Sequence, residues 1–178
     1  MEGKERRIYS ACVHEYFLDK YPIEQYKDEK HNVTCVIVES EDHNEAVFIT
    51  AGASLREDFN PVEMRIMVDS KILKDKEGMA IIKKWLDQLL DTDLSTETDL
   101  SVVKFDEEFK QHFNKAGCVF LLSNCGDPIF YDDDGFFMTY PVFLNDEELK
   151  EYEEMSEDDQ FDYIYSKDDD DGNWRLTY

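Results

Sequence analysis

The chain is short of basic residues relative to acidic ones, and this shortage excludes two classes of partner. Only 19 of its 178 residues are lysine or arginine, against 43 aspartate or glutamate, so the formal charge is −24 and the pI is near 4.3. A field of that sign repels phosphate backbones and anionic lipid headgroups. We therefore expect neither nucleic acid nor a membrane surface as a partner.

Glycine and cysteine are scarce as well. The seven glycines form neither of the glycine-rich loops that bind nucleotide phosphates, so no nucleotide or other cofactor is indicated. The four cysteines, Cys12, Cys35, Cys118 and Cys125, include no C-x-x-C pair. We therefore expect no disulfide or zinc framework, and cysteines that act as small buried hydrophobes in a reducing compartment.

Long apolar runs are absent. The longest, 118–122 and 46–49, fall far short of the roughly 20 residues that span a bilayer. The segment Met1–Arg7 begins charged and is followed by no hydrophobic region typical of a secretory signal. These patterns predict a cytoplasmic protein.

Motifs for catalysis and metal binding are missing too. His14, His31, His43 and His112 are isolated, with no H-E-x-x-H or similar spacing, and 43 carboxylates are too many for any one pair to be informative. The turn after Gly52 is no nucleophile elbow, since Arg56 replaces its second glycine. The sequence indicates no catalytic residue and no metal ligands. An enzyme with an unrecognised site stays a third hypothesis, which a pocket of converging histidine and aspartate side chains would favour.

What the chain does contain suffices for one packed domain over residues 1–178, because 42% of the residues are hydrophobic. Hydrophobic periodicity predicts helices over 4–20, 77–91, 106–116, 146–154 and 157–165. Strands are predicted over 32–38, 45–50, 62–69, 118–122 and 136–144. These elements do not alternate as βαβ units, so we expect an α+β fold with a mixed, largely antiparallel sheet flanked by helices.

Several local features refine this prediction. The runs 32–38 and 45–50 are almost continuously apolar, which suits strands covered on both faces, whereas 62–69 alternates and should have one side partly in water. Gly117 is the predicted stop of the helix before it, and Pro141 interrupts the last strand.

The C-terminal helices carry clear start signals. Asn145 and Ser156 are the expected N-caps, each followed by first-turn carboxylates. Inward stripes are expected from Leu149 with Tyr152 in the first helix, and from Phe161 with Ile164 and Tyr165 in the second.

The part of the chain from about residue 127 is strongly acidic, with 18 acidic and 3 basic residues. Two acid-rich turns, 131–135 and 167–172, lack the EF-hand spacing; each is either a solvated turn or a loose cation-binding loop. The candidate partner-binding patch consists of their carboxylates: Asp132, Asp133, Asp134, Asp168, Asp169, Asp170 and Asp171.

One constellation resembles a known family. Thr50-Ala-Gly52-Ala-Ser54 leaves a predicted strand, and Glu63 opens the next strand before its apolar positions. Downstream, a helix with Trp85-Leu86 and the run from Thr139 into Glu147-Glu148-Leu149 complete a pattern over residues 10–165 that resembles the Suppressor of fused family. The segment between 94 and 123 has no clear counterpart. We expect Thr50, Gly52, Ser54 and Glu63 to be mainly structural, with the two hydroxyls bonded to nearby backbone groups.

The resemblance implies a protein-binding module. Single-domain bacterial members of that family resemble immunity proteins, which neutralise secreted toxins, and an acidic surface suits a basic toxin domain. Exposed Tyr131, Tyr152 and Tyr165 are candidate interface anchors. The alternative is an intracellular regulatory or scaffold protein that takes up a peptide as an added strand. Acidity that serves solubility alone is a further alternative, and the oligomeric state is left open.

Overall fold

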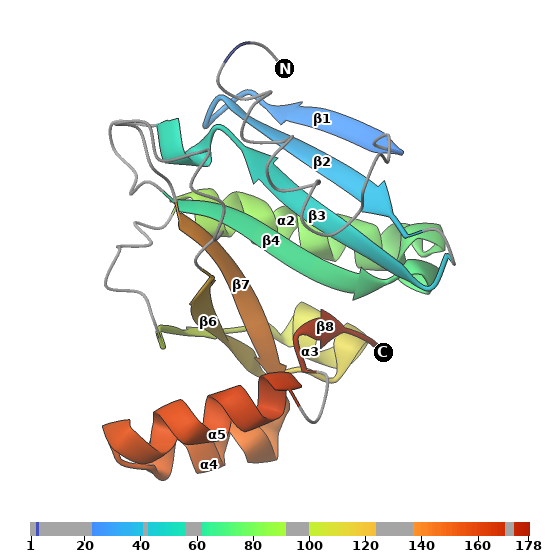
Figure 1. Cartoon of the computed structure of the whole chain (residues 1–178). Coiled ribbons are helices and arrows are strands. Elements are labelled where there is room, and N and C mark those ends of the chain that lie inside the picture. The colour runs from blue at the N-terminus through green and yellow to red at the C-terminus, as the bar shows by residue number, and fades with distance from the viewer. Residues whose placement is uncertain are drawn as a thin grey trace.

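The computed structural model describes Gly3 and residues 23–40, 43–55, 62–91, 100–123, 137–169 and 173–178. In these residues an eight-stranded sheet runs in the order β1-β2-β3-β4-β7-β6-β5, and β8 also pairs with β4 (Figure 1). The strands are β1 (Glu24–Asp28), β2 (Val33–Glu39), β3 (Glu45–Ala51), β4 (Val62–Asp69), β5 (Val102–Lys104), β6 (Gly117–Ser123), β7 (Phe137–Leu144) and β8 (Arg175–Leu176). The helix predicted over 4–20 lies outside the described residues.

Helices cover both faces of the sheet. They are α2 (Lys76–Asp91), α3 (Glu107–Phe113), α4 (Asp146–Glu154) and α5 (Glu157–Asp169), with the 3₁₀ turns η1 (Ala53–Leu55) and η2 (Ser70–Lys74). Only the pairings of β4 with β7 and with β8 are parallel among the described strands. The predicted α+β class, with a mixed, largely antiparallel sheet flanked by helices, is confirmed.

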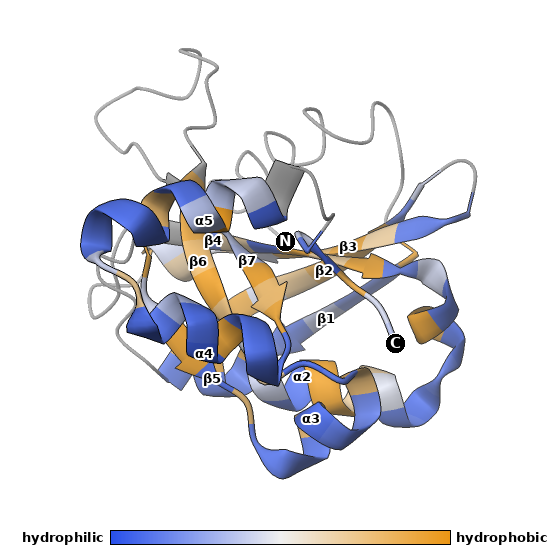
Figure 2. Ribbon diagram, turned by 90° about the horizontal axis from the view of Figure 1, so that it is seen from below, coloured by the Kyte–Doolittle hydropathy of each residue, from blue (hydrophilic) through white to orange (hydrophobic). Residues whose placement is uncertain are grey.

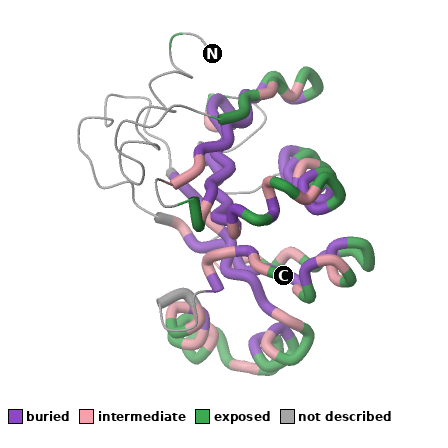
Figure 3. Tube along the Cα trace, turned by 90° about the vertical axis from the view of Figure 1, so that its right-hand side faces the viewer, coloured by how far each residue is buried: buried purple, intermediate pink, exposed green. Residues whose placement is uncertain are grey.

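The largest core lies between the sheet and α2 with α3. Apolar side chains of α2 meet one face of β2, β3, β4, β6 and β7, and Trp85 makes ring contacts with Phe105 and Phe109 at centroid distances of 5.2 and 5.5 Å. Helices α4 and α5 pack on the opposite face of β6 and β7. Figure 3 shows the buried strands along the middle of the molecule and the exposed turns of the helices outside.

The strand predictions largely hold. β2 and β3 are buried on both faces, as their continuous apolar sequences indicate, and Cys35 and Cys118 are buried free thiols. The expectation that one face of 62–69 meets water is wrong, because Glu63, Arg65 and Met67 are all buried. β4 is a central strand, so its alternating polar residues are enclosed rather than solvated.

The helix predicted over 106–116 ends earlier than expected. It is capped by Asp106 and stops at Phe113, where Asn114 takes the left-handed conformation with φ +53°. Gly117 is therefore not the stop. It opens β6, where an added Cβ would lie 2.7 Å from the Val103 carbonyl oxygen, so glycine permits the close approach of β5.

Pro141 does not interrupt β7. It lies opposite Phe120 in the antiparallel pair with β6, whereas the pairing of β7 with β4 covers only residues 137–139. The proline thus lies beyond the stretch that is hydrogen-bonded on both sides, where a missing N–H costs little.

Both predicted N-caps are present. Asn145 forms a reciprocal capping box with Glu148, and the Ser156 hydroxyl contacts Asp159 at the start of α5. α5 continues to Asp169, so residues 167–169 belong to a helix and not to a turn. Phe161 was expected to point inward, but it is 45% exposed, while Ile164 is fully buried.

Candidate functional site

The four residues of the T-x-G-x-S and glutamate motif come together around one buried carboxylate. Glu63 is the second residue of β4 and has no exposed surface. Its oxygens accept hydrogen bonds from the hydroxyls of Thr50 and Ser54 at 2.7 and 2.6 Å. They also accept from the backbone N–H groups of Gly52, Ala53 and Ser54 at 3.0, 3.3 and 3.0 Å.

The backbone of the turn makes this arrangement possible. β3 ends at Ala51, and Gly52 has φ +110°, which turns three successive N–H groups toward Glu63. The Thr50 hydroxyl also accepts a hydrogen bond from the Met64 N–H at 2.8 Å. It takes the place that a backbone carbonyl of a neighbouring strand would otherwise have. The hydroxyls thus bond mainly to Glu63, and only Thr50 has the predicted bond to a nearby backbone group.

The role of Glu63 is structural. Burial raises the pKa of the carboxyl, while the bonds from Ser54 and Thr50 favour its ionised form and oppose that rise. Five donors occupy both oxygens, and the group has no solvent contact. It ties the β3–η1 turn to β4 and offers no atom to a ligand.

The predicted acidic patch lies largely outside the described residues. Asp132, Asp133, Asp134, Asp170 and Asp171 are not described, and Asp168 and Asp169 are placed only as backbone at the end of α5. The structure therefore brings none of these seven carboxylates together in the part of the chain that it describes.

A different acidic surface is described on α4 and α5, which we call the α4–α5 surface. It contains nine exposed carboxylates and one exposed lysine, Lys150. The hydrophilic outer sides of both helices are visible in Figure 2. The carboxylates are Asp146, Glu147, Glu151, Glu153, Glu154, Glu157, Asp158, Asp159 and Asp162.

The three candidate tyrosine anchors differ in position. Tyr152 is buried at 1% exposure and its hydroxyl donates to the Leu100 carbonyl oxygen. Its place on the inward stripe with Leu149 is confirmed, and its predicted exposure as an anchor is wrong. Tyr165 is half-buried, with its ring centroid 4.6 Å from that of exposed Phe161. Tyr131 is outside the described residues. The exposed aromatic residue on α5 is thus Phe161.

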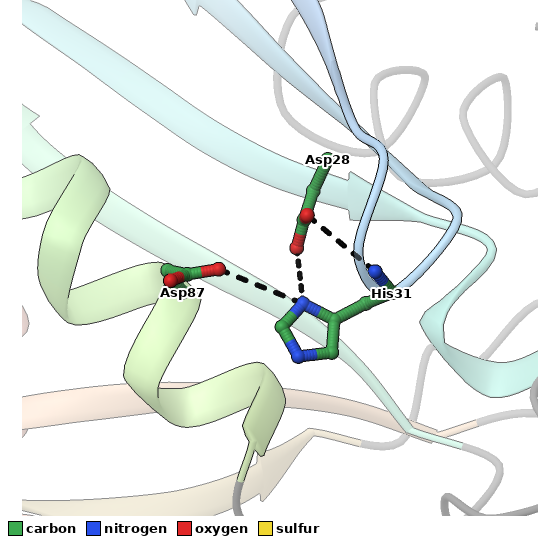
Figure 4. Close-up of side chains that lie close together, drawn as sticks. All are labelled: Asp28, His31 and Asp87. Carbon is green, nitrogen blue, oxygen red and sulfur yellow. Dashed lines mark hydrogen bonds and ion pairs between the residues drawn. The ribbon is translucent and has the colours of Figure 1, made fainter.

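Sequence reasoning missed a histidine–aspartate cluster between the β1–β2 turn and α2. His31 is buried, and its Nδ1 contacts Asp28 Oδ2 directly and lies 3.6 Å from Asp87 Oδ1 (Figure 4). Its Nε2 lies 2.7 Å from Asp91 Oδ1. We call Asp28, His31, Asp87 and Asp91 the His31 cluster.

The opposite charges in this cluster shift one another's pKa values toward the ionised forms. Burial lowers the pKa of His31, but hydrogen bonds to Asp28 and Asp91 outweigh this, and the pKa lies above its ordinary value. The Lys30 ammonium donates to Asp91 Oδ2 at 2.5 Å, and together with His31 it lowers the pKa of Asp91. The carboxylates beside both ring nitrogens thus favour the protonated form of the imidazole.

The sequence signal for this cluster was weak but present. Asp28 and His31 are three residues apart, and Asp87 and Asp91 are four apart, which places the latter pair on one side of a helix. Only the packing of α2 against β1 and β2 joins the two pairs. Spacing along the chain does not detect side chains that are brought together from two elements.

Comparison with known proteins gives no match: no family model fits the chain, and no curated protein or solved structure is significantly similar to it. The resemblance to the Suppressor of fused family therefore stays a prediction that rests on the short motifs. In the described part of the chain, no helix has the length and apolar character needed to cross a bilayer.

Proposed function

We propose that this chain is a non-enzymatic protein-binding module that acts in the cytoplasm as an immunity protein and neutralises a cognate toxin by covering its active surface. The observation that carries the proposal is the α4–α5 surface. Its partner would be a basic toxin domain.

Charge supports this assignment. Of the nine carboxylates on the α4–α5 surface, Glu153 pairs with Lys104 at 2.6 Å, and only loose contacts of 3.9 Å join Lys110 to Asp146 and Lys150 to Glu154. Most of the negative charge is thus not neutralised by a close lysine or arginine among the described residues. Such a field speeds association with a cationic partner by about 10- to 1,000-fold at low salt.

An apolar anchor lies within this field. Phe161 is 45% exposed in the middle of α5, next to Tyr165, and is followed by Asp162. An aromatic residue ringed by polar groups is the usual anatomy of a binding hot spot. The surface therefore combines electrostatic attraction with a site for close packing.

The surface is also preorganised. Leu149, Tyr152 and Ile164 anchor the two helices in the core beneath them, and capping interactions order both N-termini. A surface ordered before binding loses little conformational entropy in the complex.

The test is co-expression with the product of the neighbouring open reading frame. We expect that product to be toxic alone and harmless with this chain. The combined variant E154Q/D158N/D162N/F161A should lose protection, because it removes the anchor and three charges. The control E29Q/E77Q/E107Q removes three exposed carboxylates elsewhere and should protect fully. A neighbouring product that is harmless, or full protection by the first variant, would contradict the proposal.

A second candidate function follows from the sheet edge. Among the described strands, β1 pairs only with β2, so one side of β1 lacks a strand partner there. Uptake of a peptide as an added strand at β1 would fit the scaffold alternative. Binding of a partner that substitutions on α5 leave unchanged and substitutions in β1 abolish would favour it.

A further inference from the structure

A second site is indicated on the other side of the sheet from the α4–α5 surface. From the geometry of the His31 cluster, we propose that it binds a divalent transition metal of the zinc class, with His31 Nδ1, Asp28 and Asp87 as ligands and Asp91 as the outer partner of the imidazole. The inference does not depend on the proposed function.

The donor atoms lie close enough together to reach one ion after small side-chain shifts. The relevant atoms of Asp28, His31 and Asp87 all lie within 4.8 Å of one another, and His31 Nδ1 is 3.6 Å from Asp87 Oδ1. Ligands about 2.0–2.2 Å from a tetrahedral zinc lie roughly 3.3–3.6 Å apart. Asp28 Oδ2 contacts Nδ1 directly, so the ion would replace the proton shared by these two groups and move the carboxylate slightly outward.

The far side of the imidazole has the partner that a metal-bound histidine usually has. Histidine ligands of metals almost always donate their other ring N–H to a carboxylate or carbonyl oxygen, which fixes the tautomer and the ring orientation. His31 Nε2 has this partner in Asp91 at 2.7 Å, and Asp91 is itself held by Lys30 at 2.5 Å. Nδ1 is thereby left as the metal-facing nitrogen.

The charge balance also favours an added cation. With His31 neutral, the cluster contains the three negative charges of Asp28, Asp87 and Asp91, and only the ammonium of Lys30 is in direct contact with them among the described residues. A divalent ion would neutralise the remaining charge. The nitrogen donor selects zinc-class ions over calcium and magnesium, which prefer oxygen ligands alone.

The site is open enough for an ion to enter. The Asp87 side chain is 53% exposed, whereas that of His31 is only 5% exposed. Asp28 and Asp87 also line an open hollow of about 210 Å³ between β1 and α2, whose walls include Tyr26, Cys35 and Lys83. Asp28 and Asp87 line this hollow and His31 does not, so an ion would enter from the side of the two carboxylates.

The experiment uses the full chain after treatment with a chelator. Zn²⁺ is titrated by calorimetry in excess Mg²⁺, which occupies the exposed carboxylates, and the melting temperature is measured with and without Zn²⁺. We expect one tight equivalent and a higher melting temperature. H31Q should abolish both effects, and D91N should weaken binding about 10- to 100-fold. H43Q, which changes a histidine that is 75% exposed and paired with Glu39, should change neither.

Three results would overturn the inference. One is weak binding that H31Q and the wild type share, which would mean an adventitious ion only. Another is a Co²⁺ spectrum with a thiolate charge-transfer band, which would mean that cysteine binds the metal. H31Q alters a buried residue and can fail to fold, so D87N, on the exposed side of α2, provides a second test. The third contradicting result is Zn²⁺ binding by folded D87N that equals binding by the wild type, because it would exclude Asp87 as a ligand.

Discussion

At the scale of single residues, the most informative group is the Glu63 carboxylate. A charged side chain with no exposed surface is costly unless it is fully hydrogen-bonded, and here five donors from one turn meet that requirement. The T-x-G-x-S sequence is thereby explained: two hydroxyls and a glycine conformation are needed to surround one carboxylate.

We predict that E63A destabilises the protein by about 3 kcal/mol or more, because several buried donors lose their acceptor at once. E63Q should cost less than E63A, since its amide oxygen still accepts from part of the turn. Urea unfolding measures both. The matched control is E77Q, at an exposed position of α2, which we expect to stay within about 0.5 kcal/mol of the wild type. A loss in E63A no larger than in E77Q would show that the turn does not depend on Glu63.

The raised pKa of His31 predicts how the stability of the metal-free protein depends on pH. Its pKa is raised above the ordinary value of 6.5, so its contribution to stability is complete below about pH 6.5 and is lost as the pH rises through the raised pKa. The pKa values of Asp28 and Asp91 are lowered, so their contribution is lost only in acid, as the pH falls below about 3.8.

The free energy of unfolding of the metal-free protein should therefore decline from mildly acidic to mildly alkaline pH, and H31Q should flatten that decline. Histidine titration by NMR gives the pKa of His31 directly. A midpoint at or below 6.5 would contradict the prediction.

At the scale of elements, the sequence predicted most helices and strands but missed those whose residues lack a periodic pattern. β1, with the sequence EQYKD, and β5 and β8, with three and two residues, have too few apolar positions to be recognised. They become strands because neighbours supply hydrogen-bond partners. The course of α3 into β6 was misjudged because Asn114, and not Gly117, takes the left-handed conformation.

A substitution at Gly117 tests the close contact of β5 with β6. G117A would place a Cβ 2.7 Å from the backbone oxygen of Val103, which cannot move as a side chain would. We expect a loss of about 1–3 kcal/mol in chemical unfolding. The control in the same loop is N114G, which should be tolerated because glycine readily adopts the left-handed conformation there. Equal stability of G117A and the wild type would mean that β5 can shift without cost.

At the scale of the whole molecule, the order and composition of the elements predict the fold class, whereas the contacts between distant elements cannot be predicted from them. The α+β class follows from the order of the elements, and the buried faces of β2 and β3 follow from their unbroken apolar runs. Composition does not reveal that β4 is central, which encloses Glu63 and Arg65, or that α2 brings Asp87 and Asp91 to His31. Those facts arise from contacts distant in sequence. The residues of the Glu63 motif could be selected from the sequence, but neither their convergence on one buried carboxylate nor the His31 cluster could be predicted.

We propose that the chain works by presenting the acidic α4–α5 surface to a basic protein. The most direct test is the association rate constant with the neighbouring gene's product, measured by stopped flow from low to high salt for the wild type and for E154Q/D158N/D162N. We expect wild-type association to be fast and to slow steeply with salt, and the variant to associate more slowly and with less sensitivity to salt. Rate constants and salt dependence that are identical in the two proteins would contradict it.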